Sequence, residues 1–177
     1  MQENLNHYKV VLSLGSNHAN ALNQLQLALQ FIQTLGEISN FSSIYESKPI
    51  GFISNHHFSN MVVEIKTIYQ PINLLELLLK YEIEQGRTRV LGRYTDRPID
   101  IDIIIFEDFE INTKELTVPH PRYRERDFVI IPMLEMEKTR VENIPFYFEQ
   151  ELQRLNLAHS LVKVQINRSA IAQNWIK

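Results

Sequence analysis

Residues 98–106, PIDIDIIIF, constrain the fold more strongly than any other segment of this chain. The isoleucine-rich run that ends at Phe106 is typical of a strand buried on both faces, so the chain must build a sheet that other elements cover. On such a strand Asp100 and Asp102 point to one face, about 6.5 Å apart along the backbone, and the isoleucines around them point to the other. Because aspartate is depleted in strands, the pair indicates a function.

The chemistry open to this pair is the binding of one or two Mg²⁺ ions against a polyphosphate. The alternative is an exposed strand face that carries two acids by chance. Seven of the ten arginines lie between residues 87 and 126, and all five aspartates lie between residues 96 and 127. Clustered guanidiniums repel one another unless phosphates or carboxylates lie between them, which favours the phosphate interpretation. Arg97 is the strongest candidate, and several of the other arginines are expected to form surface ion pairs with Glu82, Glu84 and Glu125.

The hydrophobic periodicity and the turn signals place the aspartates in an alternating set of elements. Strands are expected at 8–14, 38–45, 58–66 and 98–106, and helices at 21–34 and 73–85. A hairpin is expected at 107–118, helices at 124–136 (interrupted by Pro132) and 146–157, and a last strand at 162–166. The β-α-β-β-α-β order is the ferredoxin-like arrangement, an α+β fold with helices packed on an antiparallel sheet. Because no repeat or linker divides the chain, we expect one domain over residues 1–177.

Composition and absent motifs exclude several classes of function. The formal net charge of −3 argues against broad binding to a nucleic-acid backbone, and no apolar run approaches the roughly 20 residues of a membrane span. The chain has no cysteine, which removes disulfides, thiolate metal sites and a cysteine nucleophile. The P-loop, the G-x-G-x-x-G, G-x-S-x-G and H-E-x-x-H motifs are absent. Since the N-terminus has no secretion signal, a cytoplasmic location is expected. A monomer is expected because no exposed apolar stripe demands a partner.

Three further residues allow two interpretations. Phe58 and Asn60 lie on an expected strand and Phe128 lies on an expected helix, where aromatic side chains usually belong to the core. If both rings flanked a gap, they could instead sandwich a planar heterocycle whose polar edge Asn60 would bind. The periodicity alone favours the core.

Taken together, six segments closely resemble one family. They are LSLGSN (12–17), SSIYESKPIG (42–51), FSNMVVEIKT (58–67), IEQGRTR (83–89), RYTDRPIDIDIIIF (93–106) and LTVPHPRYRERDFVIIPM (116–133). In this order and spacing they are similar to 6-hydroxymethyl-7,8-dihydropterin pyrophosphokinase (HPPK). The resemblance covers about residues 8–136, and the C-terminal part, 137–177, matches only loosely.

The resemblance implies a three-layer α/β/α fold and transfer of pyrophosphate from ATP to 6-hydroxymethyl-7,8-dihydropterin, with release of AMP, in folate biosynthesis. It implies that Asp100 and Asp102 bind two Mg²⁺ ions and that Arg87 and Arg97 grip the transferred phosphates. The nucleotide side would comprise Glu82, Arg89, Ile103, Thr117, His120 and Arg126. The pterin side would comprise Ser47, Ile50, Phe58, Asn60, Tyr94 and Phe128. The resemblance therefore reverses the preference for the core at Phe58 and Phe128.

The chain departs from the family pattern near the aspartates. Tyr94-Thr95-Asp96 stands where an aromatic-Gly-Pro sequence is usual, and Asp96 brings a negative charge beside Arg97. Pro98 replaces a usual Thr and removes a backbone donor. Ser47 stands where Thr is commoner, and Glu115 occupies a position that is basic in some relatives. None of these changes touches the aspartate pair, so activity is expected.

Two other functions are compatible with parts of this pattern. A two-metal nucleotidyltransferase would also use paired strand aspartates and an arginine-rich rim, but it would release pyrophosphate instead of AMP. It does not account for VPHPR (118–122) or for the set Phe58, Asn60 and Phe128. A non-catalytic module that binds a pterin or a nucleotide predicts loss of Asp100, Asp102 or Arg97, and all three are present.

Overall fold

An antiparallel sheet organises the computed structural model, which describes residues 7–88, 95–138, 162–163, 171 and 175. Strand β1 (Tyr8–Ser16) lies between β5 (Asp100–Phe106) and β4 (Phe58–Thr67), and β4 also pairs with β2 (Gly36–Phe41) and β3 (Tyr45–Ser47). The short β8 (Val162–Lys163) adds to β3, which makes six strands. Every pairing in this sheet is antiparallel. A separate two-stranded hairpin joins β6 (Ile111–Asn112) and β7 (Thr117–Val118).

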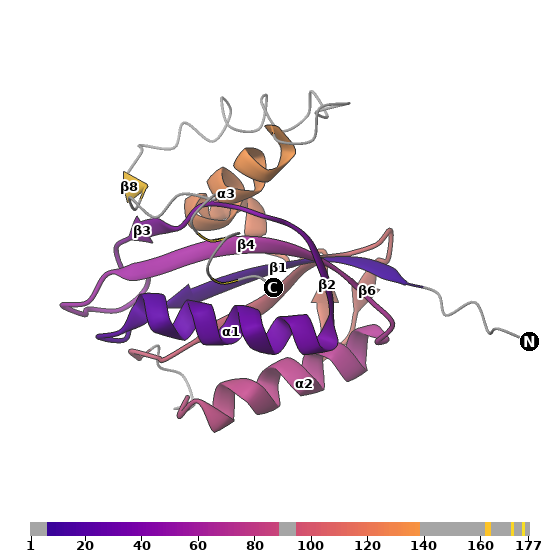
Figure 1. Cartoon of the computed structure of the whole chain (residues 1–177), viewed down its shortest axis with the longest axis horizontal. Coiled ribbons are helices and arrows are strands. Elements are labelled where there is room, and N and C mark those ends of the chain that lie inside the picture. The colour runs from indigo at the N-terminus through magenta and orange to yellow at the C-terminus, as the bar shows by residue number, and fades with distance from the viewer. Residues whose placement is uncertain (1–6, 89–94, 139–161, 164–170, 172–174, 176–177) are drawn as a thin grey trace, which may run out of the picture.

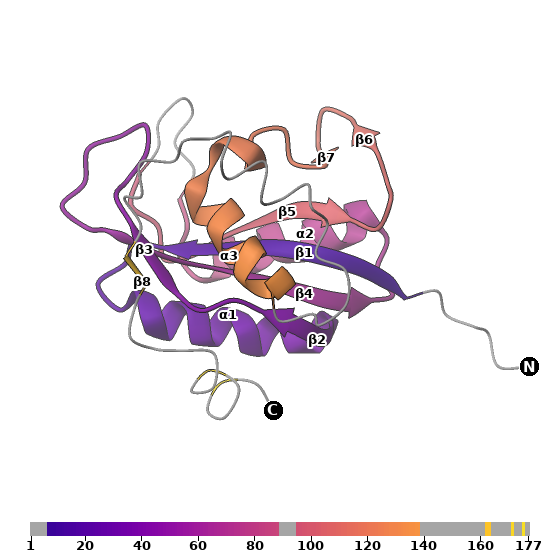
Figure 2. The same cartoon turned by 90° about the horizontal axis from the view of Figure 1, so that it is seen from above.

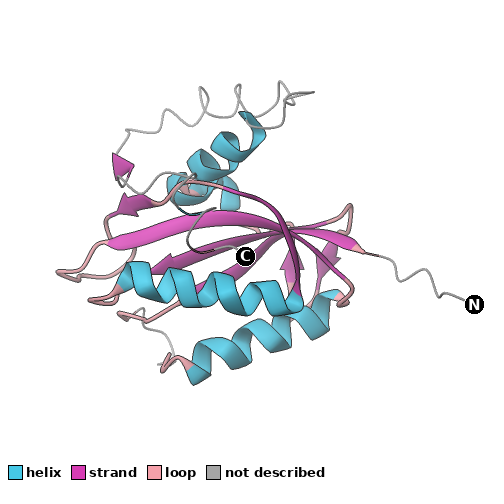
Figure 3. Cartoon of the chain, viewed as in Figure 1, coloured by secondary structure: helices cyan, strands magenta, loops and turns pink. Residues whose placement is uncertain are grey.

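Helices cover both faces of the sheet (Figure 1, Figure 2). On one face lie α1 (Ala21–Leu35) and α2 (Pro71–Glu84), and on the other lies α3 (Asp127–Lys138), which follows a single 3₁₀ turn, η1 (Tyr123–Glu125). Figure 3 shows the same three layers coloured by secondary structure. The expected α+β class, with helices packed on an antiparallel sheet, is confirmed.

The alternating pattern of the central strands explains the two layers of core. Successive strand side chains point to opposite faces, so one strand can serve both helical layers. Leu12, Leu14 and Ile101 are buried in the larger core cluster together with residues of α1 and α2. Val62 and Ile104 are buried in a smaller cluster with residues of α3. The isoleucines of β5 therefore fix which of its faces carries Asp100 and Asp102, because a shift of one residue would exchange the two faces.

The single strand expected at 38–45 is wrong, because residues 42–44 leave the ladder and separate β2 from β3. Both serines in this break are fully buried. The Ser43 backbone N–H and hydroxyl donate to the two carboxylate oxygens of Glu135 on α3, at 2.6 and 2.7 Å. The Ser42 hydroxyl accepts from the Val62 N–H at 3.0 Å. The break thus binds α3 to the sheet.

The expected interruption at Pro132 is also wrong. The helix α3 starts at Asp127, after the 3₁₀ turn, and continues through Pro132. Proline removes an interior hydrogen bond, but Val129, Met133 and Met136 are buried with residues of the sheet, and this packing stabilises the helix on both sides of Pro132. The hairpin expected at 107–118 is confirmed. The helix expected at 146–157 and residues 164–166 of the last strand lie outside the described residues. In the part of the chain that is described, no helix has the length and apolar character to span a membrane.

Candidate active site

The two aspartates stand at the edge of the sheet where β5 begins and β1 ends. In the ladder between these strands, Asp100 pairs with Gly15 and Asp102 pairs with Ser13. Asp100 and Asp102 are partly exposed, whereas Ile101 between them is buried in the core. Both carboxylates therefore point to the same face of a strand whose other face is locked in place.

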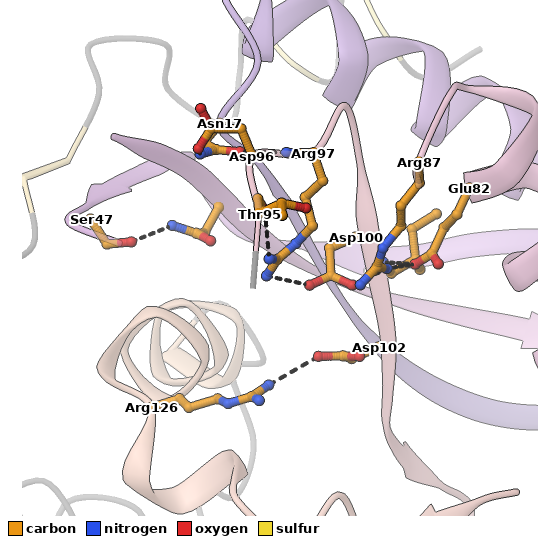
Figure 4. A network of polar contacts seen from close by, with 12 residues as sticks. Asn17, Ser47, Glu82, Arg87, Thr95, Asp96, Arg97, Asp100, Asp102 and Arg126 are labelled. Carbon is orange, nitrogen blue, oxygen red and sulfur yellow. Dashed lines mark hydrogen bonds and ion pairs between the residues drawn. The ribbon is translucent and has the colours of Figure 1, made fainter. Parts of the chain in front are cut away.

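Three arginines from different segments converge on this pair (Figure 4). The Arg87 guanidinium forms an ion pair with Asp100, and Arg97 Nη2 lies 2.7 Å from the other oxygen of the same carboxylate. Arg126 Nη1 donates to Asp102 Oδ2 at 2.9 Å. Burial opposes the charge of Arg87, but the carboxylates of Asp100 and Glu82 raise its pKa, so it stays charged.

Glu82 of α2 supports the pair from behind. Glu82 is 1% exposed. Its carboxylate accepts from the Ile101 backbone N–H at 2.7 Å and lies 2.6 Å from Arg87 Nη1. A buried carboxylate with a charged partner and a backbone donor is well satisfied. Glu82 therefore holds the strand segment between the two aspartates and one of the arginines that contact them.

Among the described residues, a first cavity lies beside β4 and α3. Asn60 is almost fully buried and donates from Nδ2 to the Ser47 hydroxyl at 2.9 Å, with the Tyr45 carbonyl 3.4 Å away. The Arg97 guanidinium lies 4.9 Å from the ring centroid of Phe58. The cavity is lined by Ser13, Gly15, Ser47, Lys48, Ile50, Gly51, Phe52, Phe58, Asn60, Arg97, Asp100, Asp102, Arg122, Glu125, Arg126 and Phe128. This cavity brings three aromatic rings and the amide of Asn60 together with the carboxylates of Asp100 and Asp102.

The second cavity lies on the other side of β5 and is roomier, about 760 Å³. It is lined by Leu75, Leu79, Glu82, Arg87, Thr88, Thr95, Arg97, Asp100, Ile101, Asp102, Ile103, Glu115, Leu116, Thr117, His120 and Pro121. Arg97, Asp100 and Asp102 therefore line both cavities. Two ligands bound in the two cavities would meet at the aspartates.

Every site residue expected from the sequence that the structure describes lies on one of these cavities. Ser47, Ile50, Phe58, Asn60, Arg126 and Phe128 line the first, and Glu82, Arg87, Ile103, Thr117 and His120 line the second. Arg89 and Tyr94 lie outside the described residues. The surface ion pair expected for the remaining arginines is found between Arg122 and Glu125, at 3.2 Å.

Other lining residues were not foreseen. Gly15 is one of them, although it is part of the LSLGSN segment. It pairs with Asn60 across β1 and β4, and a Cβ atom on Gly15 would lie 2.9 Å from Asn60 Oδ1. A glycine in a strand often marks such a close approach, which was the available signal. No such feature of the sequence marks the other unpredicted lining residues, Ser13, Lys48, Phe52, Thr88 and Thr95.

The charges around Asp100 and Asp102 favour two kinds of ligand. The carboxylates favour a cation, and the arginines beside them favour a group that accepts many hydrogen bonds. Burial, with repulsion from Asp100, raises the pKa of Asp102, although Arg126 and His120 oppose this shift. Burial lowers the pKa of His120, so this imidazole is neutral near pH 7. Arg97 Nε is buried without a hydrogen-bond partner among the described residues. An unused guanidinium donor at the junction of the cavities fits a phosphate oxygen.

The donor set of Asp100 and Asp102 fits Mg²⁺. In polyphosphate sites this ion takes one or two carboxylates and completes its shell with phosphate oxygens and water. No group of three or more acidic or histidine side chains within the described ranges could hold a metal. The pair would therefore hold the ion together with a phosphate ligand, and a cation would relieve the repulsion between the carboxylates.

Comparisons with known proteins agree on one family. The family model of 7,8-dihydro-6-hydroxymethylpterin-pyrophosphokinase (HPPK) matches residues 11–138. Curated relatives named 2-amino-4-hydroxy-6-hydroxymethyldihydropteridine pyrophosphokinase include those of Bacillus subtilis and Aquifex aeolicus. The first is 41% identical over 127 residues (71% of this chain, 75% of the relative), and the second is 38% identical over 135 residues (76% and 84%).

A solved structure supports the fold. The Plasmodium falciparum HPPK-DHPS chain with pteroate matches with a TM-score of 0.67 at 16% identity, over 89% of this chain. This chain spans 48% of the length of that Plasmodium chain. At this identity the likeness shows the fold.

The two aspartates should differ in what they contribute to stability. Asp100→Asn leaves Arg87 and Arg97 near each other without their shared carboxylate, and donors left without an acceptor should cost about 1–3 kcal/mol of unfolding free energy. Because the pKa of Asp102 is raised in the folded state, the fold favours its uncharged form, and Asp102→Asn should keep or raise the melting temperature. Thermal denaturation at pH 7 without metal or ligand measures both. Equal losses in the two variants would contradict this charge balance.

Proposed function

Since the chain belongs to the 7,8-dihydro-6-hydroxymethylpterin-pyrophosphokinase (HPPK) family, we propose that its two joined cavities bind the two substrates of the family's reaction. The enzyme transfers pyrophosphate from ATP to 6-hydroxymethyl-7,8-dihydropterin, a step of folate biosynthesis, and releases AMP. The observation that supports this assignment of the site is that Arg97, Asp100 and Asp102 line both cavities.

The first cavity would bind the pterin. Phe58 and Phe128 line it, so they would flank a planar bicyclic ring, and Asn60 would exchange hydrogen bonds with its polar edge. Asn60 is held for this task because its amide already donates to Ser47. Ile50, on the same lining, would cover the ring from the loop between β3 and β4. We assign Tyr94, which lies outside the described residues, to the same side from the family resemblance alone.

The second cavity would bind ATP. Thr117 and His120 line it as polar groups, and Ile103 lines it as an apolar one. The neutral imidazole of His120 can donate to a phosphate oxygen from one ring nitrogen without adding charge. Glu82 would act by holding Arg87 and β5 in place. Arg89 is assigned to the nucleotide from the resemblance.

The reaction needs position and charge compensation more than a strong base. The hydroxymethyl oxygen of the pterin attacks the β-phosphorus of ATP, the bond from that phosphorus to the bridging oxygen of the α-phosphate breaks, and AMP leaves with that oxygen. The hydroxyl proton passes to solvent. Arg87, Arg97 and Arg126 would turn from carboxylates toward phosphate oxygens and bind the charge that develops there.

Two Mg²⁺ ions are part of the proposal. Asp100 and Asp102 would hold them, and the ions would supply positive charge against the triphosphate. Arg97 would have two roles, because its guanidinium lies over the Phe58 ring and also beside the Asp100 carboxylate. It can therefore orient the pterin face and the transferred phosphates together.

We also propose that the chain acts as one domain over residues 1–177, as a monomer in the cytoplasm. All three statements are expectations from the sequence. The single domain is supported because the resemblance to the family covers one continuous stretch.

Product analysis tests the proposed reaction. Incubation with ATP, Mg²⁺ and 6-hydroxymethyl-7,8-dihydropterin should give AMP and the pterin diphosphate in equal amounts, and omission of the pterin or addition of a chelator should stop AMP formation. Chromatography of the nucleotides gives the answer. ADP as the product would indicate transfer of a single phosphoryl group, and pyrophosphate would indicate the nucleotidyltransferase reaction. Ligand binding without any turnover would indicate the non-catalytic module.

Gly15→Ala should weaken pterin binding and leave ATP binding intact. The new methyl group would push against Asn60 Oδ1, so the amide would lose its alignment in the first cavity. An unmade hydrogen bond to a buried group costs about 1–3 kcal/mol, so the KM for the pterin should rise about tenfold. The KM for ATP in the same assays is the internal control. An equal rise in both constants would contradict a local effect on Asn60.

A further inference from the structure

Asp96, a residue outside the family pattern, contacts two other segments of the chain near the site. Figure 4 shows it beside Asn17 and Arg97. Its Oδ1 accepts from Nδ2 of Asn17, which follows β1, at 2.6 Å. Its Oδ2 lies 3.2 Å from His56 Nδ1, in the loop between β3 and β4. A hydrogen bond from Ser54 in that loop is the largest cause that lowers the pKa of Asp96, so the carboxylate is ionised at neutral pH.

Asn17 completes the connection on the side of β1. It is fully buried, and its Oδ1 accepts from the Arg97 backbone N–H at 2.8 Å. Its own backbone N–H donates to the Arg97 carbonyl at 3.4 Å. One buried amide therefore fixes the backbone of Arg97 and the side chain of Asp96 together.

The charge of Asp96 points away from the reactive end of Arg97. The contacts of Asp96 are with Asn17, Ser54 and His56, whereas the Arg97 guanidinium bonds to Asp100 at 2.7 Å and lies over Phe58. A carboxylate beside a phosphate-binding arginine would compete with phosphate if the two groups were paired. Here the carboxylate has other partners, which leaves the guanidinium to the site.

We propose that Asp96 is a positioning residue, which ties the loop of the first cavity to the segment that carries Arg97. The inference rests on the proposed function. Residues 48–52 of the same loop include Lys48, Ile50 and Phe52, which line the cavity assigned to the pterin. Through Asn17 the carboxylate fixes where Arg97 enters the junction, and through His56 it fixes the loop over the pterin.

Asp96 has two sets of contacts, an arm to Asn17 and an arm to the loop that holds His56, and each arm should affect a different kinetic constant. Asp96→Ala breaks both arms and should lower kcat about 10- to 100-fold, because small misplacements of a group that orients substrate have effects of this size. Asp96→Asn keeps an oxygen for Asn17 and an amide that can donate to His56, so it should recover most of that loss. The double change Ser54→Ala/His56→Ala breaks the loop arm alone, because both residues contact Asp96 from that loop, and it should raise the KM for the pterin with little change in kcat. Asp108→Ala is the matched control, because Asp108 is exposed at the other end of β5 and lines neither cavity.

The experiment measures kcat and both KM values by AMP formation, with melting temperatures for all variants. A lower KM for ATP and an unchanged kcat in Asp96→Ala would overturn the inference, since Asp96 would then only repel phosphate. Equal activity losses in Asp96→Ala and Asp96→Asn would also overturn it, because a positioning role predicts rescue by the amide. If Asp96→Ala does not fold, the pterin KM of Ser54→Ala/His56→Ala decides, and an unchanged value overturns the loop arm. No AMP from the wild-type enzyme would instead refute the proposed function itself.

Discussion

The arrangement of the site depends on charge balance around two carboxylates that a strand holds on one face. Asp100 and Asp102 would repel each other in a low-dielectric site without compensation. Three arginines supply that compensation: Arg87 follows the turn after α2, Arg97 precedes β5, and Arg126 precedes α3. The position of the pair is not adjustable, because the isoleucines of β5 are packed in the core on its other face. Everything that binds there must adapt to the strand.

This constraint explains why the two cavities share a border. β5 lies between them, and its partly exposed carboxylates, Asp100 and Asp102, line both. The wall of the first cavity comes from β4 and α3, and α3 is held at its distance by Glu135, which accepts two hydrogen bonds from Ser43. The interruption between β2 and β3 thus serves the site as well as the fold. Residues 42–44 leave the strand pairing, and the hydrogen bonds from Ser43 to Glu135 hold α3 in place.

Features that depend on local periodicity could be predicted from the sequence. The face of Asp100 and Asp102, the helices α1 and α2, and the hairpin all follow from spacing and turn residues. The break at 42–44 does not, because it depends on Glu135, more than 90 positions away, which competes for the Ser43 N–H. The continuation of α3 through Pro132 depends on packing that no local rule contains. Asp96 could be seen as a departure, but its bonds to Asn17 and His56 bridge 79 and 40 positions and only the fold reveals them.

A crystal structure with Mg²⁺, the pterin substrate and an ATP analogue that cannot transfer pyrophosphate tests the central claim most directly. We expect the pterin ring between Phe58 and Phe128, the β-phosphate beside Asp100 and Asp102, and the Arg97 guanidinium on a phosphate oxygen with its Nε used. A nucleotide that leaves Arg97 paired with Asp100, or a pterin bound away from Asn60, would contradict a reaction at the junction of the two cavities.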